Sequence, residues 1–396
     1  MNEEYIILRA PSVSTRDIFL GEAASVNPLG VPEATGLKVE VTTLSKNDLA
    51  DVSRERDVVA FAMDIPIKLI APLAVEDVLQ PAAPTTAWGV KAVGADTSPF
   101  TGNGIVVSVL DTGIDASHPA FAGVEILQKD FTGEGDGDQH GHGTHCAGTI
   151  FGRNVNGNRI GVAIGVKKAL IGKVLGSNGG GSKGIINAIN WAMQNGANVI
   201  SMSLGIDFPG LVRRLQDENG LAPEVATSIA LEGYRTNVAL FEKMAQLVQA
   251  SNGFFQPTVI VAAAGNESGR DANPPFEIAV SPPAVSDGFV SVAALGQNGQ
   301  KFTVAPFSNT GAIVAGPGVA ILSAKRGGGL TNMSGTSMAT PHVAGIAALW
   351  AEQLKANGML TPAVLSARLI SSGTTSGLVT GFDPFDVGTG MVRAPQ

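Results

Sequence analysis

The chain has 396 residues, of which 44% are hydrophobic and 15% charged, a balance that excludes a disordered polymer and allows a large buried core. Its formal net charge is −8, and its lysines and arginines form no run, which argues against nucleic acid and anionic membranes as partners. Its one cysteine, Cys146, excludes an internal disulfide framework.

The first residues, MNEEYIILRA, give no sign of an export signal, because acidic side chains stand where a secretory signal carries positive charge. The apolar runs near residues 259 and 343 are too short to cross a bilayer. We therefore expect a cytoplasmic protein that has neither a membrane nor a nucleic-acid partner.

Residues 1–84 form the first predicted unit, an N-terminal module that ends in a linker. The segment LKVEVTTL predicts a strand, and residues 45–56 predict a short helix that Ser45 caps. Residues 57–70 predict one or two further strands, and the Pro/Ala-rich stretch at 79–87 predicts the linker. We therefore expect a small α+β module ahead of a larger domain.

Residues 85–396 form the second predicted unit, in which short apolar strands alternate with helical stretches. Strands that are apolar along nearly their whole length are typical of a mostly parallel sheet that helices cover on both faces. The sequence therefore predicts an α/β fold for this unit. The expected strands are 104–111, 169–175, 197–205, 258–265, 289–295 and 312–318, and the expected helices are 143–152, 182–196, 236–251, 337–355 and 361–372.

Three segments of this unit contain side chains suited to acyl transfer. The strand in VLDTGID presents Asp111, the segment HGTHCAG presents His142, and SGTSMATPHVAG presents Ser337. A serine hydroxyl becomes a good nucleophile only beside a base, and an aspartate can fix the tautomer of a histidine base. We expect Ser337 to begin a helix with Pro341 in its first turn, so that free backbone N–H groups lie beside the hydroxyl.

In this order, the three segments resemble the motifs of the subtilisin-like (S8) serine protease family, and the resemblance covers roughly residues 85–396. It implies a subtilisin-like fold and a serine endopeptidase whose catalytic triad is Asp111, His142 and Ser337. Asn266, in the segment AAAGNES, matches the oxyanion asparagine of the family. The backbone N–H of Ser337 is the second oxyanion donor that the resemblance implies.

The resemblance also implies where substrate binds. Two segments would form the walls of the pocket for the residue before the cut, and a strand and loop would pair with the substrate backbone. Because the wall residues are small or apolar, we expect broad specificity with a preference for large apolar residues before the cut, and Glu267 at the base or rim of the pocket. The wall residues are Ser203, Leu204, Gly205, Ala263, Ala264 and Gly265, and the pairing residues are Leu175, Gly176, Gly179, Gly180 and Gly181.

Residues 1–84 resemble in position the inhibitory prodomains of many members of that family. The chain's own N-terminal segment is therefore an expected intramolecular inhibitor, beside protein or peptide substrates as partners. No cofactor is expected to be required. Calcium stays open as an alternative, because VNGNRIGVA resembles the family's calcium loop although Ala120 stands where many relatives have an aspartate ligand. Asp136 and Asp138 would either form a different calcium site or be solvated.

Residues 206–236 form an insertion, because the stretch between Gly205 and the strand before Asn266 is longer than the family needs. The insertion follows a wall of the substrate pocket. It is therefore expected to form either a lid that restricts access or a surface decoration.

Several functional alternatives remain open at this point. The insertion and the missing export signal also fit a dedicated precursor-processing protease or a peptide cyclase, in which an amine takes the acyl group. A non-catalytic peptide-binding module would need no activated serine. The cluster HGHGTHC beside two aspartates also suggests zinc, but it lacks the HExxH spacing and the triad already uses His142. We expect Cys146 to be a buried structural thiol.

Overall fold

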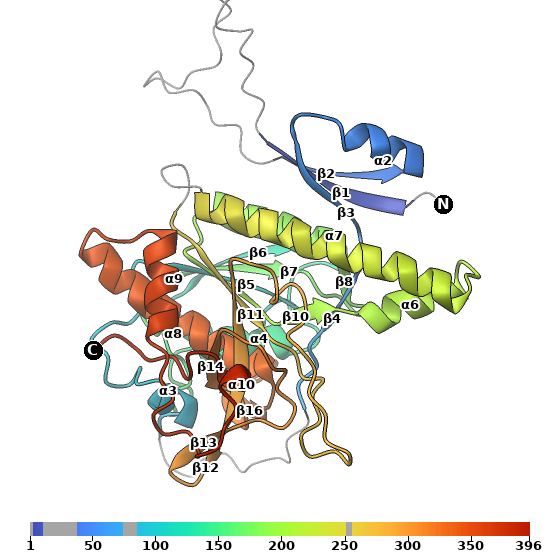
Figure 1. Ribbon diagram of the computed structural model, residues 1–396. Helices are drawn as coiled ribbons and strands as arrows, with labels where there is room; N and C mark the ends of the chain where they lie inside the picture. Colours follow the sequence, from blue (N-terminus) through green and yellow to red (C-terminus); the bar gives the residue numbers. More distant parts are fainter. Residues whose placement is uncertain (1–2, 11–37, 74–84, 251–255) are drawn as a thin grey trace, which may run out of the picture.

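The computed structural model describes residues 3–10, 38–73, 85–250 and 256–396 (Figure 1). Most of the predicted linker at 79–87 lies outside these ranges. Within them, no helix combines the length and the apolar composition that crossing a bilayer requires.

An eight-stranded sheet forms the centre of the molecule, in the order β13-β12-β11-β9-β5-β7-β6 with β14 beside β12. Its strands pair in parallel except for the antiparallel pair of β12 and β13. The predicted α/β class with a mostly parallel sheet is therefore confirmed. The strands are β5 (Val106–Asp111), β6 (Glu125–Asp130), β7 (Lys168–Lys173), β9 (Val199–Met202), β11 (Val259–Ala263), β12 (Phe289–Asn298), β13 (Lys301–Val304) and β14 (Val314–Pro317).

The strands of this sheet are buried on both faces, because alternate side chains point to opposite sides. In β11, Val259 and Val261 belong to one hydrophobic core, while Ile260 and Ala262 belong to the other. A strand that buries both faces needs apolar residues at every position, which is why these segments read as continuous apolar runs.

Helices cover the two faces of the sheet, as the sequence predicts. The first core contains residues of α3 (Trp88–Ala92), α4 (His142–Phe151), α8 (Thr336–Ala356) and α9 (Pro362–Ser371). The second contains residues of α5 (Ser182–Gln194) and α7 (Pro223–Ala250). Shorter elements complete this unit, namely η1 (Pro119–Phe121), the β15–β16 hairpin (Ile321–Ala324 and Leu330–Met333) and α10 (Pro384–Val387).

The insertion is helical, which the sequence analysis did not predict. It forms α6 (Phe208–Asp217) and extends α7, which starts at Pro223 rather than at residue 236. Asp207 caps α6 by accepting a hydrogen bond from the Gly210 backbone N–H (3.2 Å). Figure 1 shows α7, in yellow, lying between the N-terminal strands and the central sheet.

The N-terminal module is a three-stranded antiparallel sheet in the order β2-β1-β3, with one helix, α2 (Lys46–Val52). Ser45 caps α2 as predicted, and its own backbone N–H donates to Asp48 (2.8 Å) in a capping box. The strands are β1 (Glu3–Arg9), β2 (Lys38–Leu44) and β3 (Val58–Met63). The sequence analysis did not predict β1, whose first residues are acidic and resemble a chain terminus more than a strand.

A fourth strand leaves this module and enters the larger unit. After β3, the chain forms β4 (Pro66–Leu69), which lies between β10 (Leu204–Ile206) and β8 (Gly180–Gly181) in a separate small sheet. Both pairings are antiparallel. The N-terminal segment is therefore built into the structure of the larger unit rather than tethered beside it.

Candidate active site

Asp111 and His142 lie together at the carboxyl end of the central sheet. Asp111 is the last residue of β5, and His142 is the first residue of α4. The chain turns into α4 at Gly141, whose φ of 101° favours glycine. The His142 Nδ1 and Asp111 Oδ1 atoms are 2.7 Å apart, and both side chains are buried. This pairing leaves His142 Nε2 as the ring nitrogen available for proton transfer.

The electrostatics of the pair favour a protonated imidazole. Burial of the ring lowers the pKa of His142, but the Asp111 carboxylate and, to a smaller extent, Cys146 outweigh it and raise that pKa well above its ordinary value. His145, one turn further along α4, has no such partner, and burial lowers its pKa to about 3. His145 is therefore neutral, and its Nε2 lies 2.9 Å from the Ile321 carbonyl oxygen.

Asp138 connects the segments that carry the aspartate and the histidine. It is 8% exposed, and its Oδ1 accepts hydrogen bonds from Thr112 Oγ1 (2.9 Å) and the Gly141 backbone N–H (2.8 Å). Its Oδ2 accepts from the Thr144 hydroxyl (2.6 Å) and backbone N–H (2.9 Å) in the first turn of α4. The alternative that Asp138 is solvated is therefore wrong, because the side chain is buried and protein donors occupy both of its oxygens.

Ser337 lies in the first turn of α8, which begins at Thr336. Pro341 therefore falls in the second turn, not the first as predicted. Because proline has no N–H, it cannot donate to the carbonyl four residues before it, which belongs to Ser337. That carbonyl accepts hydrogen bonds from Ser203 Oγ (3.2 Å) and Cys146 Sγ (3.4 Å) instead. The proline thus leaves the Ser337 carbonyl free to bond with two neighbouring segments.

Asn266 presents its amide group to the same cleft. Its Oδ1 accepts hydrogen bonds from the backbone N–H (2.8 Å) and hydroxyl (2.9 Å) of Thr336. These two bonds assign the amide oxygen to the protein side and aim Nδ2 outward, where it donates to the Ala71 carbonyl oxygen (3.0 Å). Thr336 was not singled out from the sequence, because a threonine beside a serine motif carries no distinctive signal.

Strand β4 occupies the cleft in which substrate was expected to bind. Leu204 and Gly205 pair with Leu69 and Lys68 on one side, and Gly180 pairs with Ile67 on the other. Ile70 follows at the level of the predicted pocket and is 2% exposed. Its Cγ1 atom lies 3.6 Å from the position that a Cβ on Gly205 would take, so the Ile70 side chain packs directly against this residue.

The remaining predicted binding residues line or support this cleft. Ser203 contacts the Ser337 carbonyl as described, and Ala263 ends β11. The Ala264 carbonyl oxygen accepts hydrogen bonds from the Ser281 backbone N–H and from Asn309 Nδ2, so this carbonyl is already engaged within the protein. At Gly265, φ is 115° and a Cβ would lie 2.2 Å from Asn309 Nδ2, so only glycine fits. Leu175 and Gly176 do not pair with β4; Gly176 pairs with Gly179 in the turn that leads to β8.

Ser337 and Asn266 donate hydrogen bonds to two different carbonyl groups. The Ser337 hydroxyl donates to the Ile70 carbonyl oxygen (3.0 Å), whereas Asn266 donates to the carbonyl of the next residue, Ala71. His142 Nε2 is buried and has no hydrogen-bond partner among the residues that the structure describes. Beyond Ala71, the chain remains attached to the cleft through a bond from the Leu73 N–H to the Ser334 carbonyl (2.9 Å).

Two carboxylates approach the lysine of β4. Lys68 Nζ is 3.5 Å from Asp207 Oδ1 and 3.9 Å from Glu267 Oε1. Glu267 Oε2 accepts a hydrogen bond from Asn309 Nδ2 (2.8 Å), which holds the carboxylate in place. Glu267 therefore faces the Lys68 side chain, two residues before Ile70. This places it at the rim of the cleft, one of the two positions predicted for it.

In the described part of the chain, one group of side chains has the proximity that a metal ion requires. It consists of Asp111, His142 and Cys146, whose ligand atoms lie within 4.8 Å of one another. Burial raises the pKa of the Cys146 thiol, and a thiol that keeps its proton is a poor metal ligand. Ala120 is buried and offers no ligand. The chemistry of this donor set fits acid–base catalysis better than metal binding.

Comparison with known proteins gives one family and several relatives. The model of the subtilase family matches residues 102–390. Subtilisin DY of Bacillus licheniformis is 32% identical over 321 residues, which are 78% of this chain and 98% of that protein. A thermostable alkaline protease of Halalkalibacterium halodurans is 35% identical over 274 residues, 67% of this chain and 62% of the relative. Subtilisin-like protease 1 of Arthroderma otae is 32% identical over 315 residues, 76% of this chain and 55% of the relative. The chain thus spans less than two thirds of the last two proteins.

Proposed function

Because the chain belongs to the subtilase family of serine endopeptidases, we propose that Asp111, His142 and Ser337 act together as its catalytic triad. The observation that carries this proposal is the 2.7 Å contact of Asp111 with His142, at a cleft where the Ser337 hydroxyl meets a peptide carbonyl at 3.0 Å. The first contact orients the imidazole for proton transfer, and the second places the Ser337 hydroxyl beside a peptide group.

The reaction proceeds in two halves. Ser337 Oγ attacks the carbonyl carbon while His142 Nε2 accepts the hydroxyl proton, and Asp111 stabilises the imidazolium that forms. Asn266 Nδ2 and the backbone N–H of Ser337 donate to the oxyanion of the tetrahedral intermediate. His142 then gives its proton to the leaving amine, which departs and leaves an ester on Ser337. Water, deprotonated by His142, attacks this ester. The bond to Ser337 Oγ breaks, His142 returns the proton to that oxygen, and the new carboxyl end is released.

The preferred substrates of this site are extended peptides with a large apolar residue before the cut. Supporting this preference, Ile70 lies buried against Gly205 in the predicted pocket, and β4 pairs with both walls through its backbone. Backbone pairing reads no side chains, so the remaining specificity is broad. Cleavage of a peptide library mainly after acidic residues would contradict this preference.

The N-terminal module and β4 together act as the intramolecular inhibitor of this site. The segment blocks the cleft and presents its carbonyls out of step, because Ser337 engages Ile70 while Asn266 engages Ala71. Attack needs the nucleophile and the oxyanion donor at the same carbonyl. The bound segment is therefore a poor substrate. Cytoplasmic localisation, independence from cofactors and the boundary of the module at residue 84 stay predictions.

Labelling with a serine-directed phosphonate tests the proposal. We would place a recognition sequence for an unrelated protease within residues 74–84, so that the folded chain can be cut there and the N-terminal fragment removed. Labelling is expected to be slow in the intact chain, fast after removal, and absent from Ser337→Ala in both forms. Equal labelling of Ser337→Ala would show that another residue is the nucleophile, and fast labelling of the intact chain would contradict inhibition.

A further inference from the structure

The two helices of the insertion share a hydrophobic core with the N-terminal module. Buried residues of both belong to this core. From the module these are Ile6 and Leu8 of β1 and Ala62 and Met63 of β3, and from the insertion they are Leu211 and Leu215 of α6 and Ala226 and Ala230 of α7. The module's inner face is therefore covered by the insertion together with α5.

One buried hydrogen bond lies directly beside this interface, from the first residue of α7 after the insertion. Asn237 Nδ2, on α7, donates to the Met63 carbonyl oxygen at the end of β3 (2.8 Å), and the Asn237 side chain is fully buried. The same Nδ2 also reaches the Gly233 carbonyl (2.9 Å) in its own helix. A buried polar contact to a backbone atom depends on position and not only on apolar area, so it fixes where β3 lies on α7.

The inserted part of α7 also has a shape that matches the module. A Cβ atom on Gly233 would lie 3.1 Å from Met63 Cε and 3.5 Å from Ile65 Cγ2, so glycine lets the module approach α7 closely. A small pocket beside this contact is shared between the two partners, lined by Tyr5, Leu49, Phe61, Ala62 and Met63 from the module and by Ile229, Glu232, Gly233 and Thr236 from α7.

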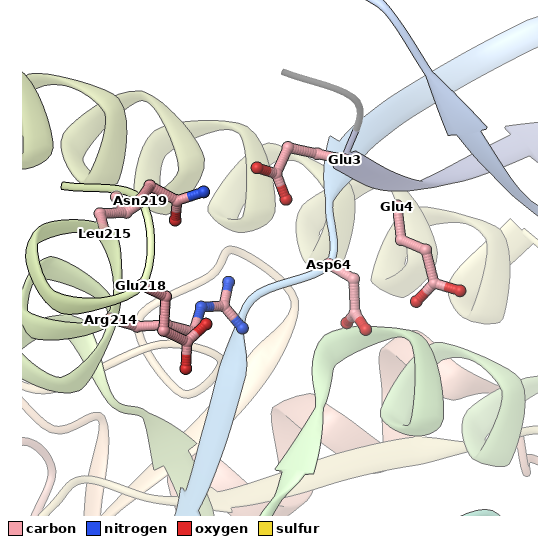
Figure 2. Close-up of a pocket in the computed structure, with 7 residues that line it drawn as sticks. All are labelled: Glu3, Glu4, Asp64, Arg214, Leu215, Glu218 and Asn219. Atoms are coloured by element: carbon pink, nitrogen blue, oxygen red, sulfur yellow. The ribbon is translucent and has the colours of Figure 1, made fainter. Parts of the chain in front are cut away.

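The edge of the interface is a polar pocket, shown in Figure 2. Glu3, Glu4 and Asp64 face it from the N-terminal segment, and α6 with its following turn contributes Arg214, Leu215, Glu218 and Asn219. Arg214 is the cation in this lining and lies among four carboxyl groups. Lys183 of α5 also pairs with Glu4 and Asp64, so the edge attracts the N-terminal segment to α6 through Arg214 and to α5 through Lys183.

We infer that the insertion is a docking platform that retains the N-terminal module on the catalytic unit after the chain between them has been cut. This inference rests on the proposed function, in which the module inhibits. A cut after β4 would leave the module held only by non-covalent contacts. The insertion adds its buried apolar surface, the close approach at Gly233 and the Arg214 edge to them, next to the Asn237 bond. The insertion thus acts on the lifetime of the inhibited state and not on access of substrate.

The test measures how fast the severed module leaves. We would use the full chain in a Ser337→Ala background, with the recognition sequence within residues 74–84, and cut it after folding. Gly233→Leu would place a bulky side chain on the docking surface while favouring the helix, and Asn237→Ala would remove the buried bond. Ser228→Leu is the matched control, because Ser228 is exposed on the same helix.

Size-exclusion chromatography after cutting scores retention without any reference to activity. We expect the unmodified chain and Ser228→Leu to keep the fragment, and Asn237→Ala to lose it about 10-fold faster, the effect of one buried hydrogen bond. Gly233→Leu should lose it at least as fast. Equal retention in all four proteins would overturn the inference, and since two variants act by different means, a folding defect in one leaves the other decisive.

The same variants with Ser337 intact separate this inference from the proposed function. Once the fragment is gone, all of them should cleave one peptide set with the same kcat/KM and the same substrate range. A changed substrate range in Gly233→Leu would return the insertion to the role of a lid and overturn the inference. If released enzyme regains no activity and no phosphonate labelling, the proposed function fails, while chromatography still decides whether the platform retains the module.

Discussion

The two faces of the central sheet have different tasks. The face covered by α4 and α8 carries His142 and Ser337 at the N-terminal ends of those helices, next to Asp111 at the end of β5. The face covered by α5 and α7 carries no member of the proposed triad and packs against the N-terminal module. Chemistry on the first face depends on single atoms, whereas docking on the second depends mainly on apolar area and shape. Substitutions should therefore separate turnover from inhibition.

The largest separation is expected for Asp111→Asn, on the catalytic face. The amide cannot hold the imidazole in the required tautomer, so kcat should fall about 10⁴-fold, the effect known for this substitution in a related triad. KM and retention of the module should not change. Steady-state kinetics on released enzyme, with chromatography of the cut chain, would measure both.

The pH profile of the same variant gives a second readout with a definite sign. The His142 base works only when neutral, and because Asp111 raises its pKa, activity of the native enzyme should rise with pH through that raised value. Without the carboxylate, burial, which lowers the pKa of the ring, is opposed only by the smaller effect of Cys146. The acid limb of residual activity should therefore move to lower pH. A limb that stays in place would mean that Asp111 does not set the protonation of His142.

A smaller loss is expected for Asn266→Ala. Removing one oxyanion donor should lower kcat about 10²–10³-fold, the magnitude known for the corresponding asparagine of subtilisin, with little change in KM. Asn187→Ala is the matched control on the other face, since Asn187 Nδ2 donates only to the Lys183 carbonyl within α5 (3.0 Å). Equal kcat values for the two variants would remove Asn266 from the reaction.

The comparison of the two faces also explains what the sequence could and could not predict. Asp111, His142, Asn266 and Ser337 stand in motifs whose chemistry restricts the residue type, and the apolar strands that position them are visible as continuous runs. The structure brings these residues to one cleft. The sheet class, too, followed from strands that are apolar on both faces.

What the sequence did not predict depends on contacts between distant segments. β4 pairs with β10, so that Lys68 meets Gly205, and nothing in the local pattern of either segment specifies the other. The sequence does not distinguish Asp138 from the other loop aspartate, Asp136, because its hydrogen-bond donors come from segments that only the fold brings together. The insertion was expected to be a lid or a decoration, since apolar complementarity to another module leaves no motif.

Asp64→Asn, on the face covered by α5 and α7, is expected to change the pH dependence of module release by a few-fold. Asp64 joins β3 to β4 and accepts hydrogen bonds from the backbone N–H of Lys183 (2.9 Å) and from Ser182 Oγ (3.1 Å) at the start of α5. Burial, the largest cause, raises the pKa of Asp64 above the ordinary 3.8. The N–H and the charge of Lys183, together with Ser182, oppose this rise, and Glu4 adds to it.

A carboxyl group whose pKa is raised in the docked state takes up a proton on docking. Its contribution to docking is therefore fully present below 3.8 and is lost as the pH rises through the raised value. Release of the severed module should accelerate with pH in the native chain, and Asp64→Asn, which stays neutral, should flatten that dependence on the order of a few-fold. Identical pH profiles for the two chains would show that the Asp64 carboxyl does not control docking, whereas kcat of the released enzyme should be equal in both.

The smallest effect is expected at Glu267, which pairs with Lys68 of the inhibitory strand β4. Lys68 is 42% exposed and its contacts with Asp207 and Glu267 are 3.5 and 3.9 Å, so the pairs are worth about 0.2–1 kcal/mol at most. If β4 lies as substrate does, peptides with Lys three positions before the cut should be preferred over Gln about 2-fold, and Glu267→Gln should remove this preference. Glutamine keeps an oxygen for Asn309, so the pocket itself is preserved.

High salt should weaken the same preference in the native enzyme, because exposed ion pairs are screened. Lys68→Gln in the intact chain should weaken the binding of β4 by the same factor as replacing Lys by Gln weakens the preference for a peptide. The reason is that the Glu267 carboxylate would face both Lys68 and the lysine of the peptide. A peptide preference that survives Glu267→Gln at low salt would mean that β4 and substrate do not share this subsite. In that case the inhibitory strand would lie in the cleft differently from substrate, and its offset carbonyls would reflect its own way of binding.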